Sequence, residues 1–214
     1  MSKLPNVQIN NAIELALKER KAREFAETLE LQIMLRDYNP DKEKKFNSTV
    51  ILNHPIKRNI KICVIGTITH IDQAKALKLD YKDMDELNII AKENKLVKKW
   101  ARQYDVLLVS DSLKLKFIKL VGKQVNSVGQ QPSFILENEN VEAKLQELLK
   151  TVRFRIKKGP WLATAIATDS LSVDEIRQNI LRSINFLISL LPKGWQNIRS
   201  LTVKSTMGQP AKLY

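Results

Sequence analysis

Two hydrophobic patterns occur along the chain, and each predicts a different kind of strand. In 29–35 an aliphatic residue stands at nearly every second position, as in a strand with one face toward solvent. Segments 151–157 and 199–204 show the same alternation. Continuous apolar runs occupy three middle segments, 60–66, 104–110 and 132–137. Such runs are typical of parallel strands that are buried on both faces.

Apolar residues at helical spacing separate these strands. We expect helices over six segments, about 6–20, 70–78, 83–103, 111–121, 140–150 and 172–191. Asn140 is a candidate N-cap for the fifth helix. Ser172 and Glu175 form a capping box that opens the last helix, and Pro192 ends it.

Two further strands are expected from residue type and from the turn residues that flank them. The segment 161–168 follows a Lys-Gly-Pro sequence, so we expect it to form a hairpin with 151–157. A shorter strand begins at about residue 49, after a charged loop, and Pro55 stops it.

The order of these patterns predicts a discontinuous arrangement. Strands with one solvent face lie toward both ends, and buried strands alternate with helices in the middle. We therefore expect 1–59 and 151–214 to form one α+β domain, with 60–150 inserted as an α/β domain that contains a parallel sheet. Two covalent connections between such domains make a hinge, which permits rigid-body motion.

Charge is the unusual part of the composition. The chain has 36 Lys and Arg against 23 Asp and Glu, a net charge of +13, and a pI near 9.8. Such an excess is self-repelling unless an acidic partner neutralises it, and nucleic acid is a more common partner than an anionic membrane. Aromatic residues make up only 6% of the chain, so we expect contacts with backbone and shape more than base stacking.

Other features bound the class of protein. A length of 214 residues suffices for one large domain or two small ones. No apolar run reaches the roughly 20 residues of a membrane span, and 1–11 lacks the apolar core of a signal peptide. Cys63 is the only cysteine, which excludes an internal disulfide and fits a reducing compartment such as the cytoplasm.

The segment 60–150 contains no complete nucleotide-binding motif of either common kind. Gly66 stands alone after 60–66, where a dinucleotide site needs Gly-x-Gly-x-x-Gly. Gly122 and Lys123 are followed by Gln124, where a phosphate-binding loop needs Ser or Thr. A nucleotide-dependent enzyme stays an alternative, and it would require ligand binding at the end of the strand 60–66.

Metal and triad chemistry also lack support. His54, His70 and Cys63 are the only soft ligands, and none has zinc-site spacing. We expect Cys63 to be a small buried apolar residue, and neither histidine has the context of a catalytic triad. These residues give no signal of metal-dependent or triad catalysis.

Basic residues gather in three places. Arg153 and Arg155 share the solvent face of the strand 151–157, and a pair of arginines suits bidentate contacts with phosphate. The segment 92–102 places five cations along a helix, as either a solvated face or a phosphate-facing one. The basic run 18–25 ends the first helix, where cations also favour the helix dipole.

Four segments together resemble the eukaryotic branch of the ribosomal protein L-one family, which provides the protein of the mobile stalk of the large ribosomal subunit. They are 23–55, 74–88, 94–113 and 185–214. The most specific marks are the sequence Lys-Ser-Thr-Met-Gly at 204–208 and the pattern F-x-E-T-x-E at 25–30.

The resemblance implies a fold and a function. The family has a split α+β sandwich made from both chain ends and an inserted Rossmann-like domain, in agreement with the domains predicted above. Its first domain binds ribosomal RNA, and the stalk moves to guide deacylated tRNA out of the exit site. We therefore expect a monomer within the cytoplasmic ribosome, beside other ribosomal components, that is not an enzyme and has no cofactor and no membrane partner. An RNA regulator of the same fold outside the ribosome is the other alternative.

The resemblance also implies RNA-binding residues. Carried over by motif they are Phe25, Glu27, Thr28, Ser200, Ser205, Thr206, Met207 and Gly208, to which we add Lys204 from the same motif and the pair Arg153 and Arg155. Glu24 stands where relatives often have a basic residue, with Arg23 beside it. Gln124 stands where relatives often have glycine, in a loop expected at 122–132.

The Ser-Thr-Met-Gly sequence combines groups suited to RNA. Ser205 and Thr206 offer hydrogen-bond donors to phosphate, ribose or base edges. Met207 offers an adaptable packing surface, and Gly208 permits close approach of RNA backbone and any positive φ that the turn needs. We expect changes at Met207 and Gly208 to affect RNA binding with little effect on stability.

Overall fold

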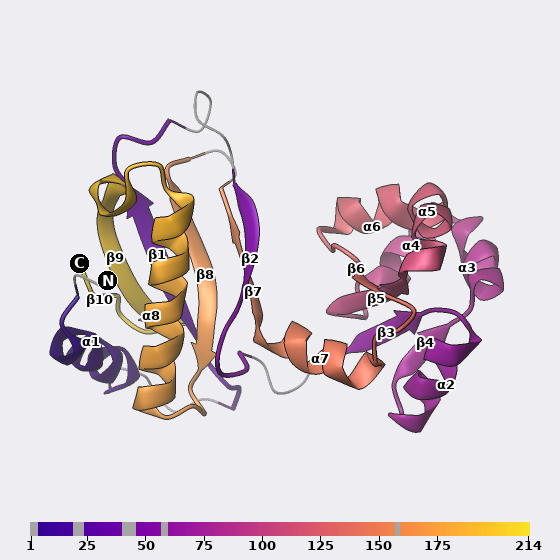
Figure 1. Cartoon of the computed structure of the whole chain (residues 1–214), viewed down its shortest axis with the longest axis horizontal. Coiled ribbons are helices and arrows are strands. Elements are labelled where there is room, and N and C mark those ends of the chain that lie inside the picture. Colours follow the sequence, from indigo (N-terminus) through magenta and orange to yellow (C-terminus); the bar gives the residue numbers. More distant parts are fainter. Residues whose placement is uncertain (1–3, 19–23, 40–45, 57–59, 157–158) are drawn as a thin grey trace. The chain divides into compact units, whose positions relative to one another are not determined.

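The chain divides into two compact units (Figure 1). The computed structural model describes residues 4–18, 24–39, 46–56, 60–156 and 159–214. Unit 1 comprises Met1–Lys57 and Leu148–Tyr214, and unit 2 comprises Arg58–Glu147. The predicted mixture of helices with parallel and antiparallel sheets is confirmed. The assignment of 1–59 with 151–214 and of 60–150 as domains stays a prediction.

Unit 1 is built on a four-stranded antiparallel sheet in the order β10-β9-β1-β8. The strands are β1 (Thr28–Leu35), β8 (Trp161–Thr168), β9 (Ile198–Ser205) and β10 (Ala211–Lys212). Alternate residues of β1 and β9 are buried, as the sequence predicts. The two-residue strand β10 was not predicted.

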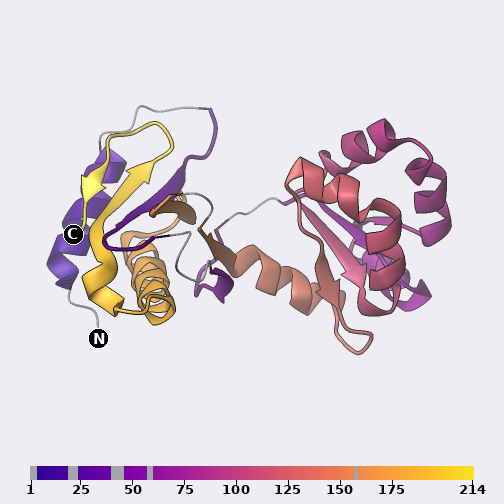
Figure 2. The same cartoon turned by 90° about the horizontal axis from the view of Figure 1, so that it is seen from above.

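Two helices cover the buried face of this sheet (Figure 2). They are α1 (Asn6–Lys18) and α8 (Val173–Leu190), and a short 3-10 helix η3 (Gly194–Asn197) precedes β9. Ile13 of α1 and Ile184 of α8 join Leu31 of β1 in one hydrophobic core. The other face of the sheet carries half-buried and exposed side chains, because successive residues of a strand point to opposite faces.

The remaining strands of unit 1 correct one prediction. The expected hairpin between 151–157 and 161–168 is wrong. Strand β7 (Thr151–Arg155) pairs with β2 (Asn47–Ile51), whereas β8 pairs with β1. The Pro160 carbonyl accepts a hydrogen bond from the Leu35 N–H at 2.7 Å. The chain that follows Pro160 therefore pairs with β1 and not with β7.

Helix α8 begins as predicted and contains one buried polar residue that the sequence did not single out. The Ser172 hydroxyl accepts from the Glu175 N–H, and the Glu175 carboxylate accepts from the Ser172 N–H, which completes the capping box. Asn179 lies on the buried stripe. Its amide oxygen accepts from the His54 N–H at 3.1 Å, and its amide nitrogen donates to the carbonyls of His54 and Ile166 at 3.2 and 3.0 Å.

Unit 2 contains a four-stranded parallel sheet in the order β4-β3-β5-β6. The strands are β3 (Ile62–Ile65), β4 (Asp80–Lys82), β5 (Val106–Ser110) and β6 (Ser133–Ile135). Helices α2 (Ile68–Ala76) and α7 (Val141–Lys150) begin and end within two residues of their predicted bounds. Cys63 is fully buried in β3, and burial raises the pKa of its thiol to about 12.

Two helix predictions in unit 2 need correction. The helix expected over 83–103 is two helices, α3 (Met84–Ala91) and α4 (Asn94–Ala101), because Glu93 is extended at φ −117° and ψ 111°. The helix expected over 111–121 continues to Val128 through four segments, η1 (Asp111–Leu113), α5 (Lys114–Phe117), η2 (Ile118–Gly122) and α6 (Lys123–Val128).

The segment 122–132 is therefore not a loop over most of its length. Val121 and Val125 are buried four residues apart, a spacing that holds one helical face against the core. Gly129 ends the helix at φ 92°, in the left-handed region that glycine favours. The short strand β4 was missed because its three residues are exposed or half-buried and show no hydrophobic run.

The hydrogen bonds of Asn179 lead to the first testable outcome. We expect Asn179→Ala to lower the free energy of unfolding by roughly 2–4 kcal/mol, because it leaves three backbone groups without their partner. Gln178 is the matched control, since among the described residues its exposed amide has one hydrogen-bond partner, the His54 ring at 3.0 Å. Gln178→Ala should stay within about 0.5 kcal/mol of the parent chain in urea unfolding. Equal losses in the two variants would contradict this account.

Candidate nucleic-acid interface

The start of β1 and the end of β9 meet in unit 1. Leu29 and Ser205 are partners in the antiparallel register. One residue beyond that pair, the Thr206 hydroxyl accepts from the Thr28 N–H and donates to the Thr28 carbonyl, both at 3.1 Å. The side chain of Thr206 thus continues the strand ladder where the backbone leaves it. Two sequence marks that are 178 residues apart form one surface here.

A turn between β9 and β10 carries the Ser-Thr-Met-Gly sequence. The Gly208 N–H donates to the Ser205 carbonyl at 3.3 Å, and β10 then pairs with β9, with Ala211 opposite Val203. Met207 projects from this turn with 60% of its surface exposed. Phe25, just before β1, is 52% exposed. Large apolar side chains exposed next to a structured turn mark a surface suited to a ligand.

The structure corrects the expected roles of the hydroxyl groups. Ser205 is buried, with 1% of its surface exposed, so it cannot present a donor to RNA in this conformation. The Thr206 hydroxyl proton is directed to Thr28, which leaves the hydroxyl a structural role in the turn. Glu27 is also buried, at 3% exposure, and its carbonyl accepts from the Asp169 N–H at 3.0 Å. Ser205 and Glu27 therefore lie beneath the surface, whereas Thr206 is exposed and ties the turn to Thr28.

Gly208 is required for packing and not for a positive φ. Among the described residues, the glycines with positive φ are Gly129 and Gly194. A Cβ at position 208 would overlap the Ser205 Oγ and lie 3.7 Å from the carbonyl oxygen of Ala16 in α1. This contact argues that a side chain at position 208 lowers stability unless the Ser205 hydroxyl rotates away, so the expected small effect on stability stays a prediction.

Ser200 and Lys204 lie along β9, on the face opposite its buried residues. Lys204 is the register partner of Glu30, close to the turn, and Ser200 is the partner of Met34. Five residues of strand separate Ser200 from Ser205, which is about 17 Å at the usual rise. The motif residues therefore form a line along β9 rather than one compact cluster.

Arg153 and Arg155 stand apart from this line. They lie on β7, which pairs with β2. Strands β1 and β8 separate this pair from β9, because β9 contacts β1, β1 contacts β8, and β8 contacts β7. The Arg153 guanidinium donates to the Asn47 side chain. Partial burial, followed by repulsion from Arg155, lowers the pKa of Arg153. Among the described residues, no hydrogen bond or ion pair links either arginine to the turn at 205–208.

The other basic segments keep their alternatives. In α4, Lys95, Lys98 and Lys99 are exposed while Val97 and Trp100 are buried, an arrangement that suits a solvated face and a phosphate-facing one equally. Most of the run 18–25, including Arg23, lies outside the described residues; Glu24 is exposed.

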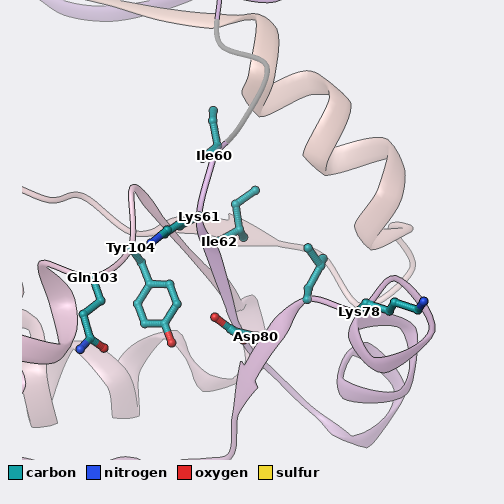
Figure 3. A pocket seen from close by; sticks show the side chains of 8 residues that line it. Ile60, Lys61, Ile62, Lys78, Asp80, Gln103 and Tyr104 are labelled. Atoms are coloured by element: carbon teal, nitrogen blue, oxygen red, sulfur yellow. The ribbon is translucent and has the colours of Figure 1, made fainter. Parts of the chain in front are cut away.

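A pocket in unit 2 bears on the enzyme alternative (Figure 3). It has a volume of about 460 Å³ and is lined by residues that include Lys61, Asp80 and Tyr104. These residues lie where β3, β4 and β5 begin, whereas parallel α/β sheets bind nucleotides at the carboxyl ends of their strands. Burial raises the pKa of Tyr104 to about 12, further from neutral pH than that of an ordinary tyrosine. The pocket therefore gives no support to a nucleotide enzyme.

Two other kinds of feature are absent from the described part of the chain. No three His, Cys, Asp or Glu side chains there are grouped as metal ligands. None of its helices combines the length and apolarity that crossing a bilayer requires.

The packing of Gly208 against Ser205 gives a second testable outcome. Gly208→Ala should lower the free energy of unfolding by about 1–3 kcal/mol, the usual cost of overpacking. The Ser205 Oγ has no hydrogen-bond partner among the described residues, so Ser205→Ala should change stability little. In the double variant the Oγ is gone, and most of the loss should be recovered. Melting curves for the four chains measure this coupling, and additive losses would refute it.

Comparisons with known proteins identify the family of this chain. The model of the ribosomal protein L1p/L10e family matches residues 17–209. The chain is 41% identical to large ribosomal subunit protein uL1 of Entamoeba histolytica over 214 residues, which is 100% of both chains. It is 41% identical to the uL1 protein of Caenorhabditis elegans, again over 100% of both chains. It is 42% identical to that of Drosophila melanogaster over 96% of this chain and 94% of the relative.

These matches cover both sequence marks and both units. They confirm the resemblance noted from the sequence, and a family of ribosomal proteins agrees with the prediction that the chain is not an enzyme. The chain belongs to the ribosomal protein L1p/L10e family.

Proposed function

We propose that the chain is a structural constituent of the large ribosomal subunit, where it binds ribosomal RNA through unit 1 and forms part of the mobile stalk. The observation that carries this proposal is the junction of Thr28 with Thr206, because it assembles two family-specific segments into one surface. Relatives that match over their whole length are large ribosomal subunit proteins by name. The net charge of +13 suits a polyanionic partner.

The line from Phe25 and Met207 along β9 to Ser200 is the RNA-binding surface. Met207 and Phe25 supply exposed apolar area for a ribose or a base, and Lys204 supplies positive charge between them and Ser200. Thr28, Ser205, Thr206 and Gly208 hold the turn in shape. Arg153 and Arg155 contact phosphates at a separate place on unit 1, because their strand is not part of the sheet that contains β9.

The insertion of unit 2 supports a role in movement. Two chain connections join the units, one near residue 57 and one near residue 148 within α7, so a change in their relative position would be confined to a few backbone positions. We propose that this motion lets the stalk assist release of deacylated tRNA, which the protein contacts transiently. In this role the chain acts as a monomer among other components of the cytoplasmic ribosome, without a cofactor.

Met207 provides the direct test of the RNA surface. Met207→Ala should weaken binding of the full chain to a transcript of the large-subunit stalk RNA by roughly 1–2 kcal/mol, because it removes a partly buried packing surface. Val7→Ala is the matched control: Val7 is 70% exposed in the first turn of α1, on the helical layer of unit 1. The control should bind and melt like the parent chain. Filter binding or fluorescence anisotropy gives both dissociation constants.

Two companion measurements make the outcome decisive. Affinity should fall about tenfold or more between low and physiological salt if several phosphates are contacted. The chain should also co-sediment with large ribosomal subunits, which a regulator acting outside the ribosome would not do. Salt-insensitive binding, or equal affinities of the two alanine variants, would reject the proposed surface.

The division of labour between the units is a further testable outcome. A shortened chain that joins 1–59 to 151–214 through a short linker should fold and keep most of the RNA affinity, because the whole line of β9 residues lies in it. The segment 60–150 alone should bind the same transcript weakly. Full affinity in the isolated segment 60–150 would overturn both the site and the domain assignment.

A further inference from the structure

The open face of the sheet in unit 1 exposes two large apolar side chains. Trp161 at the start of β8 is 67% exposed, and Met34 near the end of β1 is 43% exposed. The two are register partners, so they are neighbours across adjacent strands. The same alternation that buries Ile33 and Leu162 places both on the face away from the core. Two adjacent exposed apolar side chains make this face a candidate contact surface.

The absence of a side chain at Gly159 leaves room for the indole of Trp161. A Cβ there would lie 2.5 Å from its Nε1 and 2.8 Å from its Cδ1. Any other residue at this position would therefore require the ring or the backbone to shift.

A groove lies beside this ring. Its volume is about 300 Å³, and it is lined by residues that include Gln32, Met34, Trp161, Ala163, Ser200 and Thr202. Apolar groups supply most of this lining, and polar groups contribute at its β9 side. The side chains of Gln32 and Ser200 make no hydrogen bond with any described residue, so an amide and a hydroxyl remain available. The size is at the lower end of small-molecule sites.

We propose that this groove binds one unpaired base of the RNA, stacked on the indole of Trp161 and hydrogen-bonded by Gln32 and Ser200. The inference rests on the proposed RNA-binding function and adds a subsite to it. Flat aromatic rings with nearby amide and hydroxyl groups are how proteins recognise splayed single-stranded bases. Because Trp161 is 67% exposed, much of its surface is open to a base.

Continuity and charge identify RNA as the occupant. Ser200 belongs both to the groove and to the line of motif residues along β9, and Thr202 and Lys204 join the groove to the turn. An RNA strand that contacts Met207 and runs along β9 reaches the groove after about 17–20 Å, the length of the strand. Arg199 and Lys212 add exposed positive charge on β9 and β10, which suits a phosphate backbone.

The test compares two substitutions of the ring in the full chain. With a transcript of the large-subunit stalk RNA as the probe, Trp161→Ala should weaken binding about tenfold, as expected for loss of one stacked base. Trp161→Phe should stay within about threefold of the parent, because a phenyl ring still stacks. Val7→Ala is again the surface control. Stacking should also quench the emission of Trp161, so the RNA-induced quench should be smaller in Trp161→Phe than in the parent chain.

The outcomes separate this inference from the proposed function. If Met207→Ala loses affinity while Trp161→Ala binds like the parent and the quench is the same in Trp161→Phe, the base site is wrong and the RNA surface stands. If the parent chain does not bind the transcript, both fail. If Trp161→Ala does not fold, loss of the quench in Trp161→Phe at near-parent affinity still supports stacking, and an unchanged quench overturns it. If Trp161→Ala leaves RNA affinity unchanged but abolishes binding of another protein to the chain, the face belongs to that protein and the inference is overturned.

Discussion

Pairing between β1 and β9 joins segments that lie about 170 residues apart, with Gln32 opposite Thr202. Closing so long a loop costs conformational entropy, although that cost grows only slowly with length. The ladder is supported by the burial of Leu31, Leu201 and Val203 beneath α1 and α8. The sheet of unit 1, the turn at 205–208 and the groove beside Trp161 all depend on this one register. A slip of one residue would turn every motif side chain on β9 to the opposite face.

Much of the fold was readable from residue periodicity. The alternation in 29–35 and 199–204 identified which residues of β1 and β9 are buried, and Ser172 with Glu175 marked the start of α8. Hydrophobic periodicity did not predict which strands pair. It indicates which face of a strand is buried but not which strand is its partner, so β7 and β8 were wrongly paired with each other.

The site was readable only in part. Family resemblance identified the residues at both ends of the β1–β9 pair, but a motif does not say which of its members face solvent. Ser205 is buried and Thr206 is bonded to Thr28, while Met207 is exposed. Trp161 was visible only as one apolar residue in a strand. Its place beside Met34 depends on the β1–β8 register, which no local pattern determines.

The Thr28–Thr206 hydrogen bonds have a consequence for the timing of synthesis. A ribosome makes Thr28 early and Thr206 178 residues later, so the surface cannot exist on a chain that stops before β9. Truncated products would keep unit 2, whose strands lie between residues 62 and 135, yet they would lack the junction that joins β1 to the turn. A chain that ends before Gly208 would therefore lack the surface that we propose binds RNA.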